Sequence, residues 1–132
     1  MREILFRGKR VDNGEWVVSD SFYQCNGIIK LWDEPNRDGY VEVIPKTVGQ
    51  YTGLKDKIGK KIFEGDIVLF EDESPLNYEY HDCTEMRCGE IKFDDGQFYI
   101  TNRIAVYMED LIYSDTMDCK VIGNIHDNPE LL

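Results

Sequence analysis

The chain has 132 residues, of which 42% are hydrophobic and 12% aromatic, and this composition predicts one folded domain rather than a disordered chain. No apolar run reaches the roughly 18 residues of a membrane helix, and MREILFRGKR lacks the apolar segment of a secretion signal. We therefore expect a cytoplasmic protein whose four cysteines are thiols. The whole net charge of −11 comes from residues 71–132, which contain four basic and fifteen acidic residues. This negative charge disfavours binding of polyanions such as nucleic acid by the second half of the chain.

The first half of the chain predicts β-hairpins. The segments ILFRGKRV and EWVVSD flank Asp12-Asn13-Gly14, and the segments SFYQC and IIKLWD flank Asn26-Gly27. Asn and Gly tolerate positive φ, so both sites predict tight turns between antiparallel strands. A turn at residues 36–39 leads into the strand pattern YVEVIP. We expect Trp16 and Trp32, which lie in these strand patterns, to belong to the core.

The second half predicts further short strands, KIFEGDIVLF, CGEIKFDD, GQFYITN and KVIGNIH. Asp94-Asp95-Gly96 predicts a turn between the strands CGEIKFDD and GQFYITN, and this explains the two carboxylates better than a role in acid–base catalysis does. Residues 104–115 hold either a strand or about two helical turns. Asn128-Pro129-Glu130 predicts an N-capped terminal turn of helix. Strands this short, separated by Gly-rich turns, are typical of a small all-β barrel or sandwich.

The segment GLKDKIGKKIFEGD, residues 53–66, is the candidate phosphate-binding loop. The spacing of Gly53 and Gly59 is wrong for such a loop, and Lys61 stands where it needs Ser or Thr. The segment predicts instead a β-hairpin with a three-residue loop. Gly59 would take the positive φ of its bulge, and Ile58 would stay right-handed.

Four segments together carry a resemblance to a known family. FRGKRVDNGEWV, IPKTVGQYTGLKDKIGKKIFEGDIV, GEIKFDDGQFYI and VIGNIHDNPELL resemble, in order, the YopX family of small proteins encoded by phages and prophages of bacteria. The resemblance implies an SH3-type barrel with an N-terminal β extension packed on it, working inside the host cell. It implies no reaction. Ile58 departs from the Asn more usual in such turns, and residues 71–87 carry no family motif.

We therefore predict a mainly β protein that forms one compact unit. Residues 1–50 would form the β-hairpin extension, and residues 51–132 the SH3-like barrel with an acidic loop at 71–87. The acidic stretch EDESPLNYEYHDCTE lies within this loop.

The candidate chemical sites are incomplete. His81, Cys83 and Cys88 follow the pattern H-x-C-x4-C, whereas a structural zinc site needs four ligands and usually C-x2-C. We expect ordinary thiols there, with a Cys83–Cys88 bridge as the minor alternative, and no metal or cofactor. Neither His81 nor His126 stands in a recognisable nucleophile–base–orienter set. The sequence thus favours a protein that is not an enzyme.

Two functions fit these observations. The first is a binding or assembly module that acts on a host or phage protein, including mimicry of nucleic acid by the acidic half. The second is an accessory protein that binds nucleic acid, with lysines on phosphates and tyrosines on bases. Unpaired strand edges would also allow a homo-oligomer. The candidate binding residues are Tyr51, Lys55, Lys57, Lys60, Lys61, Tyr78 and Tyr80.

Overall fold

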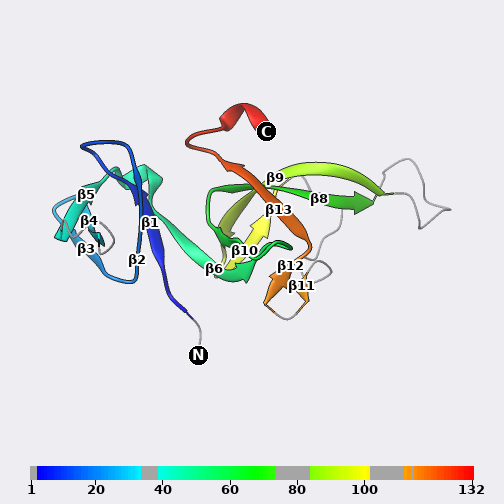
Figure 1. Ribbon diagram of the computed structural model, residues 1–132, viewed down its shortest axis with the longest axis horizontal. Helices are drawn as coiled ribbons and strands as arrows, with labels where there is room; N and C mark the ends of the chain where they lie inside the picture. Colours follow the sequence, from blue (N-terminus) through cyan, green and yellow to red (C-terminus); the bar gives the residue numbers. More distant parts are fainter. Residues whose placement is uncertain (1–2, 34–38, 74–83, 102–111, 114) are drawn as a thin grey trace. The chain divides into compact units, whose positions relative to one another are not determined.

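The computed structural model describes residues 3–33, 39–73, 84–101, 112–113 and 115–132 (Figure 1). Contacts divide the chain into two compact units, Met1–Gly53 and Leu54–Leu132, rather than the single unit expected from the sequence. The mainly β prediction is confirmed, because strands dominate the described residues and their helical segments are short 3-10 turns. No helix in this part of the chain has the length and hydropathy needed to cross a membrane.

In the first unit, the predicted hairpin at Asp12-Asn13-Gly14 is confirmed. It joins the antiparallel strands β1 (Phe6–Lys9) and β2 (Trp16–Ser19), and Gly14 has a φ of 74°. Strand β1 also pairs with the beginning of β6 (Gly49–Lys55). A 3-10 turn at Pro45–Thr47 precedes β6.

The other sheet of the first unit has the order β3-β4-β5, with strands Phe22–Cys25, Ile28–Asp33 and Gly39–Val43. Asn26 and Gly27 have φ values of 51° and 80°, as the two-residue turn between β3 and β4 requires. Burial alternates along β4 and β5, so one face of this sheet supplies the core and the other is exposed. The core of the unit consists of Val17, Ile29, Leu31, Val41 and Val43, with Phe6 and Val48 packed against it.

In the second unit, four antiparallel strands form a sheet of order β10-β9-β8-β13. Figure 1 shows β8 and β9 as two long strands side by side, and they pair antiparallel. Asp95 and Gly96 have φ values of 50° and 76° in the predicted turn between β9 and β10. Within the described residues the sheet is open, with β10 and β13 at its edges. The strands are β8 (Asp66–Glu73), β9 (Thr84–Asp94), β10 (Gln97–Ile100) and β13 (Cys119–Asn124).

Short strands complete the second unit. The end of β6 pairs with β7 (Lys61–Phe63) and, in parallel, with β12 (Thr116–Met117), which pairs with β11 (Ile112–Tyr113). Of the ambiguous segment 104–115, residues 112–113 are therefore strand, and residues 104–111 lie outside the described part. The core consists of Ile62, Val68, Phe70, Ile91, Ile100, Met117, Cys119 and Val121.

The chain ends in a 3-10 turn at Pro129–Leu131, which confirms the predicted terminal turn but not its cap. The Asn128 side chain makes no capping hydrogen bond. Its Oδ1 accepts a hydrogen bond from the Asn124 backbone N–H at 3.3 Å instead. A Cβ at Gly123 would lie 2.6 Å from this Oδ1, so the glycine makes room for the amide.

The predicted three-residue loop between β6 and β7 is confirmed. The Asp56 N–H donates to the Lys60 carbonyl at 2.7 Å, and the Gly59 N–H donates to the Asp56 carbonyl at 3.0 Å. Gly59 has a φ of 90°, whereas Ile58 is not among the residues with positive φ. Ile58 is 69% exposed at this tip, so it is tolerated because it neither enters the core nor needs a left-handed backbone.

The buried carboxylate of Asp56 connects this loop to the opposite end of the chain. Asp56 is 1% exposed. Its Oδ1 accepts hydrogen bonds from the N–H groups of Ile58 at 3.1 Å and Lys60 at 2.8 Å. Its Oδ2 accepts one from the N–H of Val121 in β13 at 3.0 Å. One side chain therefore orders the loop and attaches β13 to it.

Replacing this carboxylate is expected to destabilise the second unit. Asp56→Ala would leave the Val121 N–H buried without its acceptor and should cost about 3 kcal/mol of unfolding free energy. Chemical denaturation followed by far-ultraviolet circular dichroism measures this, because both tryptophans lie in the first unit. The exposed Asp118→Ala is the matched control. Equal midpoints for the two variants would contradict the role assigned to Asp56.

Candidate binding surfaces

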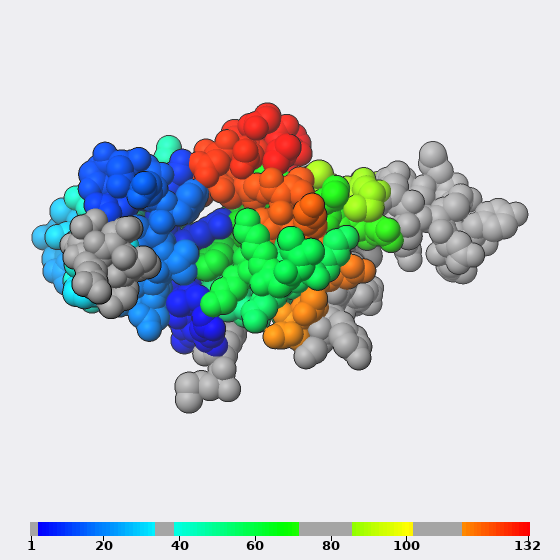
Figure 2. Space-filling model, in the orientation of Figure 1, coloured from blue at the N-terminus to red at the C-terminus, as the bar shows by residue number. Residues whose placement is uncertain are grey.

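The four predicted lysines lie on the hairpin of β6 and β7. Lys57 and Lys60 are exposed in and beside its loop, and Lys55 and Lys61 are half-buried on its strands. Figure 2 shows this hairpin, in green, on the surface of the second unit. The structure thus brings the lysines together on one short element, with the loop pair directed to solvent.

The predicted aromatic partner of these lysines is not available for stacking. Tyr51 is only 4% exposed, so the expectation that its ring stacks on a base is wrong. Its backbone N–H donates to the Leu5 carbonyl at 2.8 Å, which places it inside the β-structure of the first unit. Tyr78 and Tyr80, the other aromatic candidates, lie outside the described residues.

An exposed aromatic cluster lies instead on the outer face of the β3-β4-β5 sheet. Tyr23, Trp32 and Tyr40 are 50%, 39% and 47% exposed. The Tyr40 ring lies 5.2 Å from Trp32 in an edge-on arrangement and 6.3 Å from Tyr23, measured between ring centroids. The hydroxyls of Ser21 and Tyr40 lie 2.5 Å apart. We call Tyr23, Trp32 and Tyr40 the aromatic face.

The expectation that both tryptophans belong to the core is therefore not met, because Trp32 is exposed and Trp16 is not part of the core cluster. Alternation in β4 buries Ile29, Leu31 and Asp33 and turns Trp32 outward. Successive strand residues face opposite sides, so the sequence shows that Leu31 and Trp32 cannot both enter the core, but not which of the two does. Trp16 is half-buried, with the Arg7 guanidinium 4.8 Å from its ring centroid.

The aromatic face carries one central pair of opposite charges. Strand register places Lys30 between Tyr23 of β3 and Glu42 of β5. Lys30 is half-buried and Glu42 exposed. The surface is thus amphipathic, because it combines rings for apolar contact with one basic and one acidic side chain.

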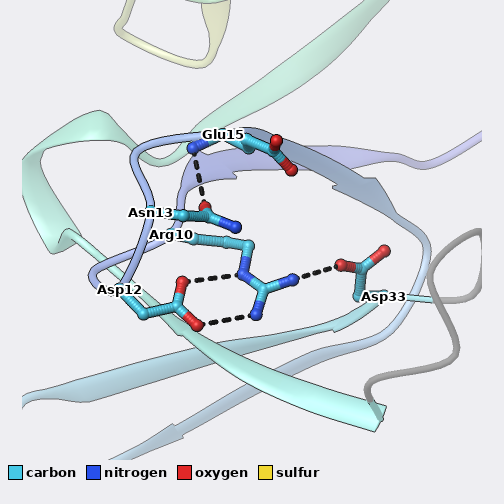
Figure 3. Close-up of polar contacts among 5 residues, drawn as sticks. All are labelled: Arg10, Asp12, Asn13, Glu15 and Asp33. Atoms are coloured by element: carbon cyan, nitrogen blue, oxygen red, sulfur yellow. Dashed lines mark hydrogen bonds and ion pairs between the residues drawn. The ribbon is translucent and has the colours of Figure 1, made fainter.

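Arg10 forms a charge cluster that stabilises the first unit (Figure 3). Its guanidinium donates two hydrogen bonds to Asp12, at 2.9 and 2.7 Å, and one to Asp33 at 2.9 Å. Arg10 and Asp33 are 8% and 2% exposed. The Asn13 side chain completes the turn by accepting a bond from the Glu15 N–H at 2.9 Å. The cluster joins the β1–β2 turn to the end of β4 and is structural.

Comparison with known proteins identifies the family. The YopX protein family matches residues 5–132. The chain belongs to the YopX family. A search of curated proteins found no significant match. Among solved structures, the chain is similar to protein EF1440 from Enterococcus faecalis, with a TM-score of 0.57 and 28% identity over 100% of this chain and 99% of that chain.

In this YopX-family chain, the thiol of Cys119 is buried within the second unit. Burial, followed by the negative charge of Asp56, raises the pKa of Cys119 to about 12. The thiol is therefore protonated at neutral pH, and only the thiolate reacts readily. Cys25, by contrast, is exposed on β3.

Glu64, in the turn between β7 and β8, lies in an environment that favours its protonated form. Burial raises its pKa, and the neighbouring charge of Glu90 raises it further. A carboxyl whose pKa is raised on folding lowers stability as the pH rises through that pKa. The described residues contain no group of three or more His, Cys, Asp or Glu side chains suited to a metal ion. His81 and Cys83 lie outside them.

The two carboxylates that contact Arg10 are expected to contribute different amounts to the stability of the first unit. Asp33→Ala would leave the buried guanidinium partly uncompensated and should cost about 3–5 kcal/mol of unfolding free energy. Asp12→Ala should cost far less, because the Asp12 side chain is 63% exposed and that of Asp33 only 3%. Denaturation followed by tryptophan fluorescence reports on the first unit. A larger loss for Asp12→Ala than for Asp33→Ala would contradict this ranking.

The pH dependence of the Asp12 contact has a defined sign. Its hydrogen bonds from Arg10 lower the pKa of Asp12 below the ordinary value of 3.8. The contribution of this contact to folding stability is therefore complete at pH values above 3.8, and it is lost as the pH falls through the lowered pKa of Asp12.

Proposed function

We propose that this YopX-family chain is a non-enzymatic binding or assembly module. It would act on a host or phage protein in the bacterial cytoplasm, consistent with a phage or prophage origin. The observation that carries the proposal is the aromatic face, where Tyr23, Trp32 and Tyr40 are between 39% and 50% exposed. A contiguous group of exposed aromatic side chains is typical of an interaction surface, and Trp and Tyr are enriched among the residues that dominate the energetics of protein interfaces.

The geometry of the aromatic face supports a protein partner. Its rings are held at fixed distances by their mutual contacts and by the Ser21–Tyr40 hydroxyl pair, so little side-chain entropy is lost on binding. The apolar neighbour Ile28, which is 42% exposed, extends the surface along β4. Rigid aromatic anchors beside a few polar groups are the composition expected of an interface centre.

We further propose that the second unit is an SH3-type barrel that presents loops to partners. Its support is the packing of four strands around one core: Ile62 of β7, Val68 of β8, Ile91 of β9 and Val121 of β13 belong to the same cluster. The Gly59 and Asp95-Gly96 hairpins supply the tight turns that small barrels need.

The double variant Trp32→Ala/Tyr40→Ala is expected to abolish partner binding. Proteins from a host lysate that bind the immobilised wild type and not the variant would be identified by mass spectrometry and then purified. Titration with the purified partner should show at least about tenfold weaker binding by the variant, equal to about 1.4 kcal/mol.

The control for this experiment is Tyr99→Ala, which removes a tyrosine of the second unit that is 37% exposed. It should leave the affinity unchanged. If the double variant binds the purified partner as tightly as the wild type, the aromatic face is not the binding surface.

Binding of nucleic acid is the second candidate function, favoured by the exposed Lys57 and Lys60 at the hairpin loop. The second unit, however, has eight basic and eighteen acidic residues, and its net charge of −10 repels the phosphates of a nucleic acid. Gel shifts at low salt should show retardation that Lys57→Glu/Lys60→Glu removes and that the exposed Lys120→Glu retains. Wild-type protein that does not retard single- or double-stranded DNA would eliminate this function.

A further inference from the structure

Strand β3 has an open edge that is unusual in its composition. In the described residues β3 pairs with β4 alone, and all four of its residues are exposed. Phe22-Tyr23-Gln24-Cys25 contains no charged residue and no proline. Natural sheets protect exposed edges with charges, prolines or bulges, because an unprotected edge pairs with another strand.

The hydrogen-bond pattern shows which backbone groups this edge offers. The two-residue turn at Asn26-Gly27 makes Cys25 and Ile28 the hydrogen-bonded closing pair. Bonded and non-bonded pairs alternate in an antiparallel ladder, so Tyr23 also bonds to β4. The Trp32 N–H donates to the Ser21 carbonyl at 3.3 Å, as this alternation requires. The N–H and C=O groups of Phe22 and Gln24 therefore point away from β4.

Other edges of the first unit are occupied or guarded. On β5, the Glu42 carbonyl accepts from the Val11 N–H at 3.0 Å, and the Ile44 N–H donates to the Lys9 carbonyl at 2.8 Å. Strand β2 is flanked by acids at both ends, Glu15 and Asp20. Such charges oppose pairing of β2 with a second acidic chain.

Charge distribution favours a second copy of this chain as the occupant of the β3 edge. Residues 1–53 hold seven basic and eight acidic residues, a net charge of −1, whereas residues 54–132 carry the remaining −10. Two copies that meet through β3 bring together their nearly neutral halves. Repulsion between like-charged chains is weakest for contact through this part of the molecule.

We propose that two copies pair antiparallel through β3, with the twofold axis at Tyr23. Phe22 of each copy then stands opposite Gln24 of the other, and the outward backbone groups of both residues are used. Each such pair exchanges two hydrogen bonds, so the contact forms about four. This register also places the two Tyr23 side chains opposite each other at a non-hydrogen-bonded position, where cross-strand aromatic pairs are stabilising.

The dimer would join two β3-β4-β5 sheets into one. Tyr23 lies on the outer face, so the two aromatic faces would become continuous across the twofold axis. The proposed binding module would thereby present its aromatic face twice. This inference goes beyond the proposed function, and its test needs no partner protein.

Sedimentation velocity of the full chain over a concentration series tests the proposal. The contact between four-residue strands is small, so we expect a reversible monomer–dimer equilibrium with a micromolar dissociation constant. Gln24→Pro removes an N–H that faces the open edge and takes no part in pairing with β4. It should be monomeric at every concentration, whereas the control Gln24→Ala keeps the N–H and should dimerise like the wild type. Circular dichroism and tryptophan fluorescence verify that both variants fold.

A disulfide tests the register. Ser21 of one copy would lie opposite Cys25 of the other at a non-hydrogen-bonded pair, where Cα atoms are about 4.5 Å apart, close enough for a disulfide. Ser21→Cys should therefore form a covalent dimer under mild oxidation. Glu42→Cys, exposed on the same outer face but on β5, is the matched control and should not.

Three results would overturn the proposal. They are a wild-type chain that stays monomeric at high micromolar concentration, a Gln24→Pro variant that dimerises like the wild type, and cross-linking of Ser21→Cys no greater than that of Glu42→Cys. A monomeric wild type would leave β3 as an edge for a strand of another protein, which is a different occupant from the one proposed. None of these results bears on whether Trp32 and Tyr40 bind a partner.

Discussion

The second unit depends on the hydrogen bonds of one buried carboxylate. Asp56 accepts bonds from the N–H groups of Ile58 and Lys60 within its own loop and from Val121 in β13, 65 residues away in sequence. A carboxylate inside a protein is costly unless its oxygens are satisfied, and here backbone donors satisfy both. The loop that carries the exposed lysines is consequently well ordered, and β13 is attached at a defined register.

The first unit depends on a different constraint, which is the alternation of buried and exposed residues along the strands β4 and β5. One face supplies Ile29, Leu31 and Val43 to the core. The same alternation forces Trp32 outward, where Tyr40 contacts it. Arg10 and its two aspartates hold the β1–β2 turn against the end of β4. The aromatic face is therefore presented by a rigid sheet, as a binding surface with a low entropic cost should be.

Local signals in the sequence predicted the turns and strands well. Asn26-Gly27, Asp95-Gly96 and the loop at Gly59 were recognisable because positive φ restricts the residue types allowed there. The binding residues were predicted less well. Tyr51 and Trp32 both lie in strands, and in the folded chain Tyr51 is 4% exposed and Trp32 39% exposed. Which face of a strand meets a core depends on the sheet that packs against it, and this is not a local property.

By itself, the sequence determined the mainly β class, the family, most tight turns and the uneven distribution of charge, because each follows from residue type, spacing or count. Only the tertiary structure decided that Asp56 is buried, that Tyr23, Trp32 and Tyr40 form one surface, and that β3 lies at an open edge. These features depend on contacts between residues distant along the chain. Burial and edge position arise from such packing, and no short segment specifies its own neighbours.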